Sequence, residues 1–117
     1  MNKKLLEFAG FIEADIKKHH YWDWRERLAK WTEPGTGYHV KPPDFTTDLS
    51  LCFKWLVPKL YERDYFYELL QWNAGQHKAI ISKKTAGWAT IVSDAVAGNP
   101  ALALCSALEK LIDGRLV

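Results

Sequence analysis

The stretch with the greatest capacity for ligand chemistry is residues 22–31, which read WDWRERLAKW. Indole rings stack on flat ligands, and a guanidinium group holds phosphate or carboxylate oxygens in two places at once. Aromatic and arginine side chains also carry much of the binding energy at protein interfaces. We therefore predict that this stretch binds an anionic ligand or an acidic partner surface. Its candidate residues are Trp22, Trp24, Arg25, Arg27 and Trp31. An equally simple alternative is a half-buried element whose rings belong to the core and whose charges face water.

A second candidate lies in a predicted turn at residues 83–87. Lys83, Lys84 and Thr85 offer ammonium and hydroxyl groups for a phosphate, and the neighbouring Trp88 offers a ring on which a base can stack. If the fold brings this turn to residues 22–31, the two stretches form one binding surface. A solvated hairpin tip is the simpler alternative, because lysines are common at turns.

Catalysis and metal binding are not expected from the residue types and spacings present. Serines and cysteines occur, but none lies in a G-x-S-x-G turn, and no nucleophile, base and orienting group can be named together. The adjacent His19 and His20 point in different directions on a helix or a strand. No H-x-x-x-H or C-x-x-C spacing accompanies them. We predict no catalytic residues, no metal site and no cofactor. A small enzyme whose site is assembled only in space is the least supported alternative.

Length, charge and cysteine content set the broad class. The 117 residues are 48% hydrophobic, which fits one globular domain spanning residues 1–117. The formal charge of +2 is too weak for binding of extended nucleic acid. Cys52 and Cys105 each fall on the apolar stripe of a predicted helix, so we expect buried free thiols. No apolar run approaches the roughly 18 residues of a membrane span and no signal peptide is recognised, so a cytoplasmic protein without membrane contact is expected.

Helices are predicted at the start, the middle and the end of the chain. Residues 3–9 form a short helix that stops at Gly10. A second helix is capped by Thr46 or Thr47 and is kinked or ended by Pro58. A third starts at the capping residue Asn99 and stops at Gly114. The apolar stripes of the second and third helices are Leu49, Cys52, Phe53, Leu56 and Leu60, and Leu104, Leu108 and Leu111.

Strands are predicted between the second and third helices. Residues 65–72, 77–82 and 88–93 are rich in aromatic and β-branched side chains and are separated by short turns, which indicates an antiparallel meander. Residues 21–32 and 38–40 are predicted to form a hairpin across Pro34 and Gly35, with a helix over 21–32 as the alternative. The predicted fold is therefore α+β, with a small antiparallel sheet of about four strands and helices packed on it.

Several segments resemble the phage ABA sandwich domain, a family of small phage and prophage proteins. They are residues 5–11 (LLEFAGF), 43–49 (PDFTTDL), 52–60 (CFKWLVPKL) and 100–105 (PALALC), together with 109–112 (EKLI). The resemblance covers most of the chain and implies an α-β-α sandwich with a central antiparallel sheet. It implies no activity and supplies no catalytic residues.

These observations predict a phage-encoded accessory binding protein without catalysis, located in the host bacterial cytoplasm. Such a protein would counter host defence by sequestering a nucleotide signal or a defence protein, so a nucleotide or a host defence protein is the expected partner. A virion structural or assembly protein is the alternative. A homo-oligomer is expected as well, because six tryptophans and the edges of an antiparallel sheet need covering.

Overall fold

The computed structural model describes residues 1–13 and 31–114, and its largest element is a three-stranded antiparallel sheet. The strands are β4 (Tyr65–Asn73), β5 (Gln76–Thr85) and β6 (Trp88–Ala97), in the order β4-β5-β6. A two-residue turn joins β5 to β6, and both of its residues have positive φ: 37° at Ala86 and 98° at Gly87. That combination matches the right-handed twist of the flanking strands, so the turn closes a tight hairpin.

Helix α5 (Pro100–Asp113) packs on one face of this sheet. The Asn99 side chain begins the helix by accepting a hydrogen bond of 2.7 Å from the Leu102 N–H, and Pro100 occupies the first turn. The Ser93 hydroxyl of β6 donates a 2.6 Å hydrogen bond to the Ala107 carbonyl and fixes the helix on the sheet. The buried residues of α5 are Ala101, Ala103, Leu104, Cys105, Ala107, Leu108 and Leu111.

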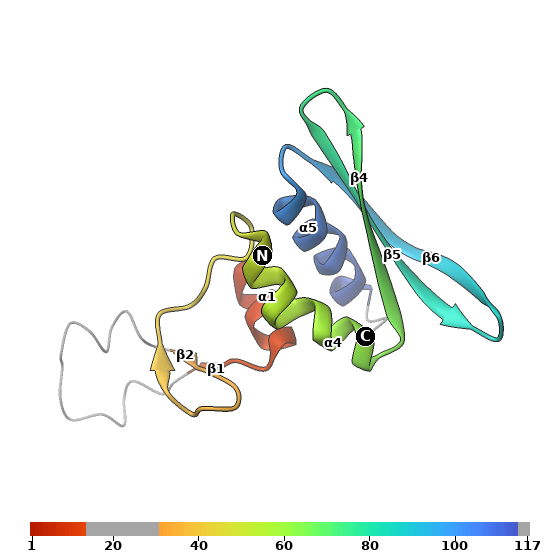
Figure 1. The fold of residues 1–117 in the computed structure, drawn as a ribbon. Helices are drawn as coiled ribbons and strands as arrows, with labels where there is room; N and C mark the ends of the chain where they lie inside the picture. Colours follow the sequence, from red (N-terminus) through yellow and green to blue (C-terminus); the bar gives the residue numbers. More distant parts are fainter. Residues whose placement is uncertain (14–30, 115–117) are drawn as a thin grey trace, which may run out of the picture.

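Among the remaining helical segments, α1 (Asn2–Ala9) and the π turn η2 (Cys52–Leu56) pack on α5, and α4 (Val57–Glu62) packs on η2 and on β4 (Figure 1). Helix α1 ends at Gly10, whose φ of 97° is a left-handed conformation that favours glycine. Helix α3 (Leu49–Leu51) passes into the wide turn of η2 and then into α4. Pro58 lies in the first turn of α4, where its missing N–H leaves no helical hydrogen bond unmade.

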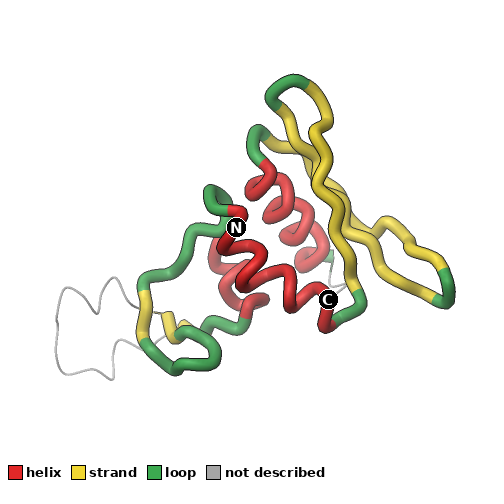
Figure 2. The backbone as a smooth tube through the Cα atoms, in the orientation of Figure 1, coloured by secondary structure: helices red, strands yellow, loops and turns green. Residues whose placement is uncertain are grey.

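A second, much smaller sheet lies at the far side of the helices, in the order β1-β2-β3. Its strands are β1 (Ile12–Glu13), β2 (Trp31–Thr32) and β3 (His39–Val40). Strands β2 and β3 pair antiparallel across the turn that contains Pro34 and Gly35, which confirms the predicted hairpin in short form. Figure 2 shows the two sheets on opposite sides of the helices.

The α+β class and the packing of helices on a small antiparallel sheet are confirmed. The main sheet has three strands rather than about four, because the hairpin of β2 and β3 forms a separate sheet. The order of layers also differs from an α-β-α sandwich with a central sheet. Within the described residues the helices lie on one side of the sheet: α5 covers β5 and β6, α4 packs on β4, and α1 packs on α5, which suits its central position because it is apolar around most of its circumference.

Two local details correct the sequence predictions. Asp48, and not Thr46 or Thr47, caps α3, because Thr46 and Thr47 bond instead to the Asp44 carboxylate. Phe53 is not part of the buried stripe: 42% of its surface is exposed. The π turn has more residues per turn than an α-helix, so Phe53 is rotated away from the core that Cys52 and Leu56 enter.

Candidate functional site

The first candidate is the end of the β5–β6 hairpin, called here the hairpin tip and made of Lys83, Lys84, Thr85 and Trp88. Figure 2 shows this hairpin running well past the end of α5. All four residues are exposed, and Trp88 is 74% exposed, the highest value among the large apolar residues that the structure describes. Thr85 and Trp88 are paired directly across the hairpin.

The two lysines of the hairpin tip lie on opposite faces of the hairpin. The Lys83 Nζ lies 5.4 Å from the ring centroid of Tyr65, which places it on the side of the sheet that α5 covers. Lys84 is the next residue along the strand and therefore points to the other side. Its backbone N–H donates to the Asp64 carbonyl at 3.1 Å, so the strand is held where the tip begins. An exposed indole thus has a cation on each side of the hairpin that carries it.

The other predicted binding residues are not brought to this tip by the described part of the fold. Trp22, Trp24, Arg25 and Arg27 lie outside the described residues, so their predicted role stays a prediction. Trp31 is 4% exposed and belongs to the core, which is the alternative that the sequence left open for its ring. Its strand β2 and the hairpin tip lie at opposite sides of the molecule in Figure 1.

The second candidate is the side of the main sheet that faces away from α5, called here the open face. Strand register places its side chains in three rows across the sheet. From the hairpin tip onward, the rows are Phe66–Ser82–Ile91, Glu68–Ile80–Asp94 and Leu70–Lys78–Val96, with Trp72 beyond them on β4. The exposed apolar side chains on this face are Phe66, Leu70, Trp72, Ile91 and Val96, from 41% to 62% exposed.

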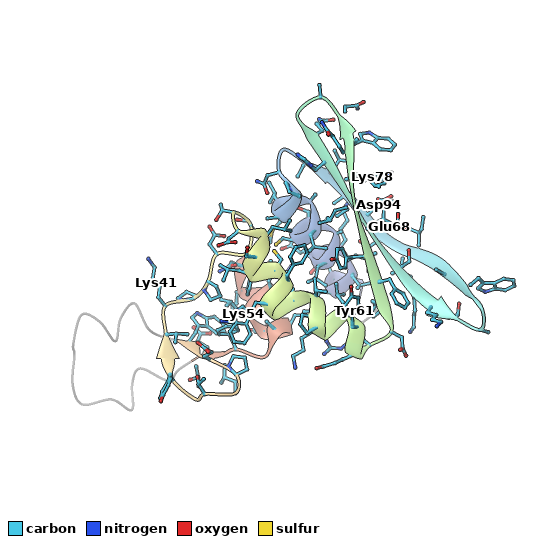
Figure 3. All side chains as sticks on the ribbon, viewed as in Figure 1. Lys41, Lys54, Tyr61, Glu68, Lys78 and Asp94 are labelled. Atoms are coloured by element: carbon cyan, nitrogen blue, oxygen red, sulfur yellow. The ribbon has the colours of Figure 1, made fainter. Side chains whose placement is uncertain are left out.

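The three rows of the open face carry three charged residues among these apolar ones, Glu68, Lys78 and Asp94, which Figure 3 shows close together on the sheet. The Lys78 Nζ lies 3.9 Å from the nearer Asp94 carboxylate oxygen and 4.2 Å from the ring centroid of Trp72. Glu68 has no ion-pair partner among the described residues. An antiparallel sheet with one solvated face usually turns polar residues outward, so this face is unusually apolar.

The sequence prediction missed the open face, although β4 contains a signal for it. Tyr65, Tyr67 and Leu69 point toward the helices, and Phe66, Leu70 and Trp72 lie on the other side of the strand, where the centroid of the Phe66 ring lies 6.3 Å from that of the Tyr61 ring at the edge of the sheet. A strand whose two alternating sets are both largely apolar is expected to be covered on both faces. The density of aromatic residues in 65–72 was enough to predict the strand, but it did not say how many of its faces are covered.

A group of aromatic rings connects α4 and η2 to β4. Tyr61 stacks on Tyr67 with ring centroids 6.2 Å apart, and Phe53 lies 5.8 Å from Tyr67. Burial raises the pKa of the Tyr67 hydroxyl above its ordinary value, and the neighbouring Tyr61 adds to the shift. The contact between the helices and the edge strand is therefore made by uncharged aromatic rings.

Cys52 and Cys105 are both fully buried and free, as predicted. Their sulfur atoms are 3.8 Å apart, and the Cys52 Sγ also lies 3.1 Å from the Phe45 carbonyl oxygen, to which it donates. The hydrogen bond with Cys52 and burial together raise the pKa of the Cys105 thiol above its ordinary value. A buried neutral thiol is a poor nucleophile, so Cys105 serves packing.

Across residues 1–13 and 31–114, no three His, Cys, Asp or Glu side chains gather as a metal site would require. The surface of the same ranges has no pocket. None of the helices there is long and apolar enough to cross a bilayer.

Comparison of the whole chain with protein-family models, with curated proteins and with solved structures finds no match. The resemblance to the phage ABA sandwich domain therefore stays a prediction from the sequence.

Proposed function

We propose that this protein is a non-catalytic binding protein that inserts the hairpin tip into an acidic cleft of a partner protein. The observation that carries the proposal is Trp88, an indole that is 74% exposed at the end of a projecting hairpin. Exposing a tryptophan forgoes a large gain from burial, and this residue type is strongly enriched where binding energy is concentrated.

The charges around Trp88 favour an acidic partner. Lys83 and Lys84 extend from the two faces of the hairpin, so a cleft that receives the tip would meet an ammonium group on each wall. Complementary carboxylates in that cleft would speed association and fix its orientation. The tight turn at Ala86 and Gly87 holds these groups on a preformed hairpin, which lowers the entropy lost on binding.

A protein partner fits this surface better than a sequestered nucleotide. Small-molecule sites are concave and enclose most of their ligand. The hairpin tip projects into solvent, and the described surface has no pocket. Nucleotide binding remains the alternative for residues 22–31 and for the tip, because Trp88 can stack on a base while Lys83 contacts a phosphate.

The resemblance to the phage family gives the partner a finer description. On that resemblance, we propose that the chain is a phage accessory protein in the host bacterial cytoplasm and that the acidic partner is a host defence protein. A virion structural or assembly role is the second proposal. It would bring the hairpin tip into contact with another virion component instead of a host protein.

The experiment places a photo-reactive phenylalanine analogue at position 88 in the full chain inside host cells. Irradiation is expected to join the chain to one acidic protein, which mass spectrometry identifies. Lys83→Glu combined with Lys84→Glu should abolish this adduct, because both ammonium groups become carboxylates facing an acidic cleft. The matched position is Tyr38, an aromatic residue 72% exposed on another turn, where no adduct is expected.

A charge control uses Lys41→Glu with Lys54→Glu, two exposed lysines that Figure 3 shows away from the tip. This double change should leave the adduct intact. Absence of any adduct at position 88, or its persistence after both tip lysines are reversed, would show the proposed surface to be wrong. A nucleotide retained by the purified chain in native mass spectrometry would favour the alternative. A virion protein in the adduct would favour the assembly role.

A further inference from the structure

We infer that the open face of the sheet is the contact surface of a two-fold dimer, with the open face of a second copy as its occupant. Phe66, Leu70, Trp72 and Val96 are all more than 40% exposed on this face, and Ile91 is 62% exposed. Several large apolar side chains exposed together on one face mark interaction sites on soluble domains. The opposite face of the same strands is already occupied by α5.

The arrangement of charge on the open face identifies the occupant. One row holds Glu68 and Asp94 on either side of Ile80, and the adjacent row holds Lys78 at its centre. Two carboxylates in one row and one ammonium group in the next make the face complementary to itself when the rows are exchanged. An unrelated partner would need to supply this same pattern in reverse, whereas a second copy supplies it by symmetry.

Only one direction of the two-fold axis satisfies these charges. An axis parallel to the strands would place Lys78 on Lys78 of the second copy and carboxylate on carboxylate. An axis across the strands reverses the order of the rows. Placed between the two charged rows, it sets Lys78 of each copy over Ile80 of the other, between Glu68 and Asp94. Glu68, which has no ion-pair partner in the described part of one chain, thereby gains one.

The same axis also pairs the apolar residues at the ends of the face. It keeps β4 over β4 and exchanges the first and fourth positions, so Phe66 of each copy faces Trp72 of the other. Aromatic pairs of this type contribute beyond the area that they bury. Two sheets stacked with their strands nearly aligned are an ordinary β-sandwich arrangement. None of the residues paired here belongs to the hairpin tip, which projects beyond α5, so this inference does not depend on the proposed function.

The test uses two charge-reversed forms of the full chain. Lys78→Glu makes all three charges of the paired rows negative, and Glu68→Lys combined with Asp94→Lys makes all three positive. The wild-type chain should be a dimer by light scattering at micromolar concentration. Each reversed form should dissociate with a constant roughly tenfold or more above the wild-type value, because like charges then face each other.

Mixing the two reversed forms should restore a dimer with one copy of each, because both facing sets are again complementary. Lys41→Glu, a matched reversal at an exposed position away from this face, should leave the dimer unchanged. Circular dichroism and thermal unfolding check that every form is folded.

Three outcomes would overturn the inference. They are a wild-type chain that stays monomeric at high micromolar concentration, a Lys78→Glu form that dimerises as well as wild type, and a mixture that fails to dimerise. If the folded wild-type monomer instead holds another protein on this face, the occupant that we infer is wrong.

Discussion

The two faces of the β4–β5–β6 sheet are built from alternate residues of the same strands and yet meet different surroundings. On one face Ala79, Ile81 and Ala95 are buried beneath α5, and the buried hydroxyl of Ser93 is bonded to that helix. On the other face similarly apolar residues stand beside Glu68, Lys78 and Asp94. Hydrophobic content therefore does not distinguish the two faces. The placement of charge does, because unpaired charges are excluded from a permanent core and tolerated on a surface that is sometimes exposed.

The largest difference between the two faces is expected in the free energy of unfolding when one apolar residue near each face is truncated. Leu108→Ala removes a fully buried side chain of α5 and should lower the free energy of unfolding by about 2–5 kcal/mol, the usual range for a core cavity. Ile91→Ala on the open face should change it by less than about 0.5 kcal/mol. Urea unfolding at a concentration where the chain is monomeric measures both values. Equal losses would mean that the open face is part of the core of the single chain.

A smaller effect is expected from the buried polar group of the covered face. Ser93→Ala removes the 2.6 Å hydrogen bond to the Ala107 carbonyl and should lower the free energy of unfolding by about 1 kcal/mol. Ser82→Ala is the matched change on the open face, and no described hydrogen bond is lost there. If the two substitutions have the same effect in urea unfolding, the Ser93 bond does not fix α5 on the sheet.

The smallest effect is expected from the ion pair of the open face. Lys78 and Asp94 are 3.9 Å apart with side chains 21% and 54% exposed, so their coupling within one chain should be at most about 0.5 kcal/mol. A double-mutant cycle with Lys78→Met and Asp94→Asn measures this coupling in the monomer. A weak coupling there together with a strong effect of Lys78→Glu on dimerisation would sharpen the contrast between the faces. A coupling of several kcal/mol would instead make the pair a determinant of the fold.

The elements that depend on local chemistry could be predicted from the sequence. Gly10 ends α1, and Asn99 begins α5, because each uses a conformation or a side-chain bond available within a few residues. The tight turn at Ala86 and Gly87 likewise produced the predicted hairpin. The end of β6 was predicted too early, at residue 93. Residues 94–97 continue to pair with β5, and no local sequence signal indicates this.

The parts that could not be predicted depend on contacts between distant segments. From the sequence alone, Trp31 fits a binding surface and the core equally well. In the structure it belongs to the core, because the small sheet packs on the helices. The order of the layers depends on which sides of α5 are covered, and a helix apolar around most of its circumference leaves that open. Of the candidate site, a hairpin end beside Trp88 was predictable from its turn residues, but the predicted turn at 83–87 was too long: Lys83, Lys84 and Thr85 pair with β6 as part of β5, and the turn itself is Ala86 and Gly87. The pairing of rows on the open face required the strand register.

The π turn at Cys52–Leu56 makes Pro58 and the buried thiol pair dependent on each other. In a regular helix the ring of Pro58 would collide with the Lys54 carbonyl, whereas the longer loop from the Val57 N–H to the Cys52 carbonyl leaves room for it. The wide turn acts as a phase shift between two stretches of helix. It keeps Cys52 in contact with Cys105 while Leu60, beyond the proline, still enters the core. Without Pro58 the chain could form a regular α-helix here. Either the contact of Cys52 with Cys105 or the burial of Leu60 would then be lost. Homologous chains should therefore vary at these positions together, so that the proline and the extra residue of the turn are kept or lost as one unit.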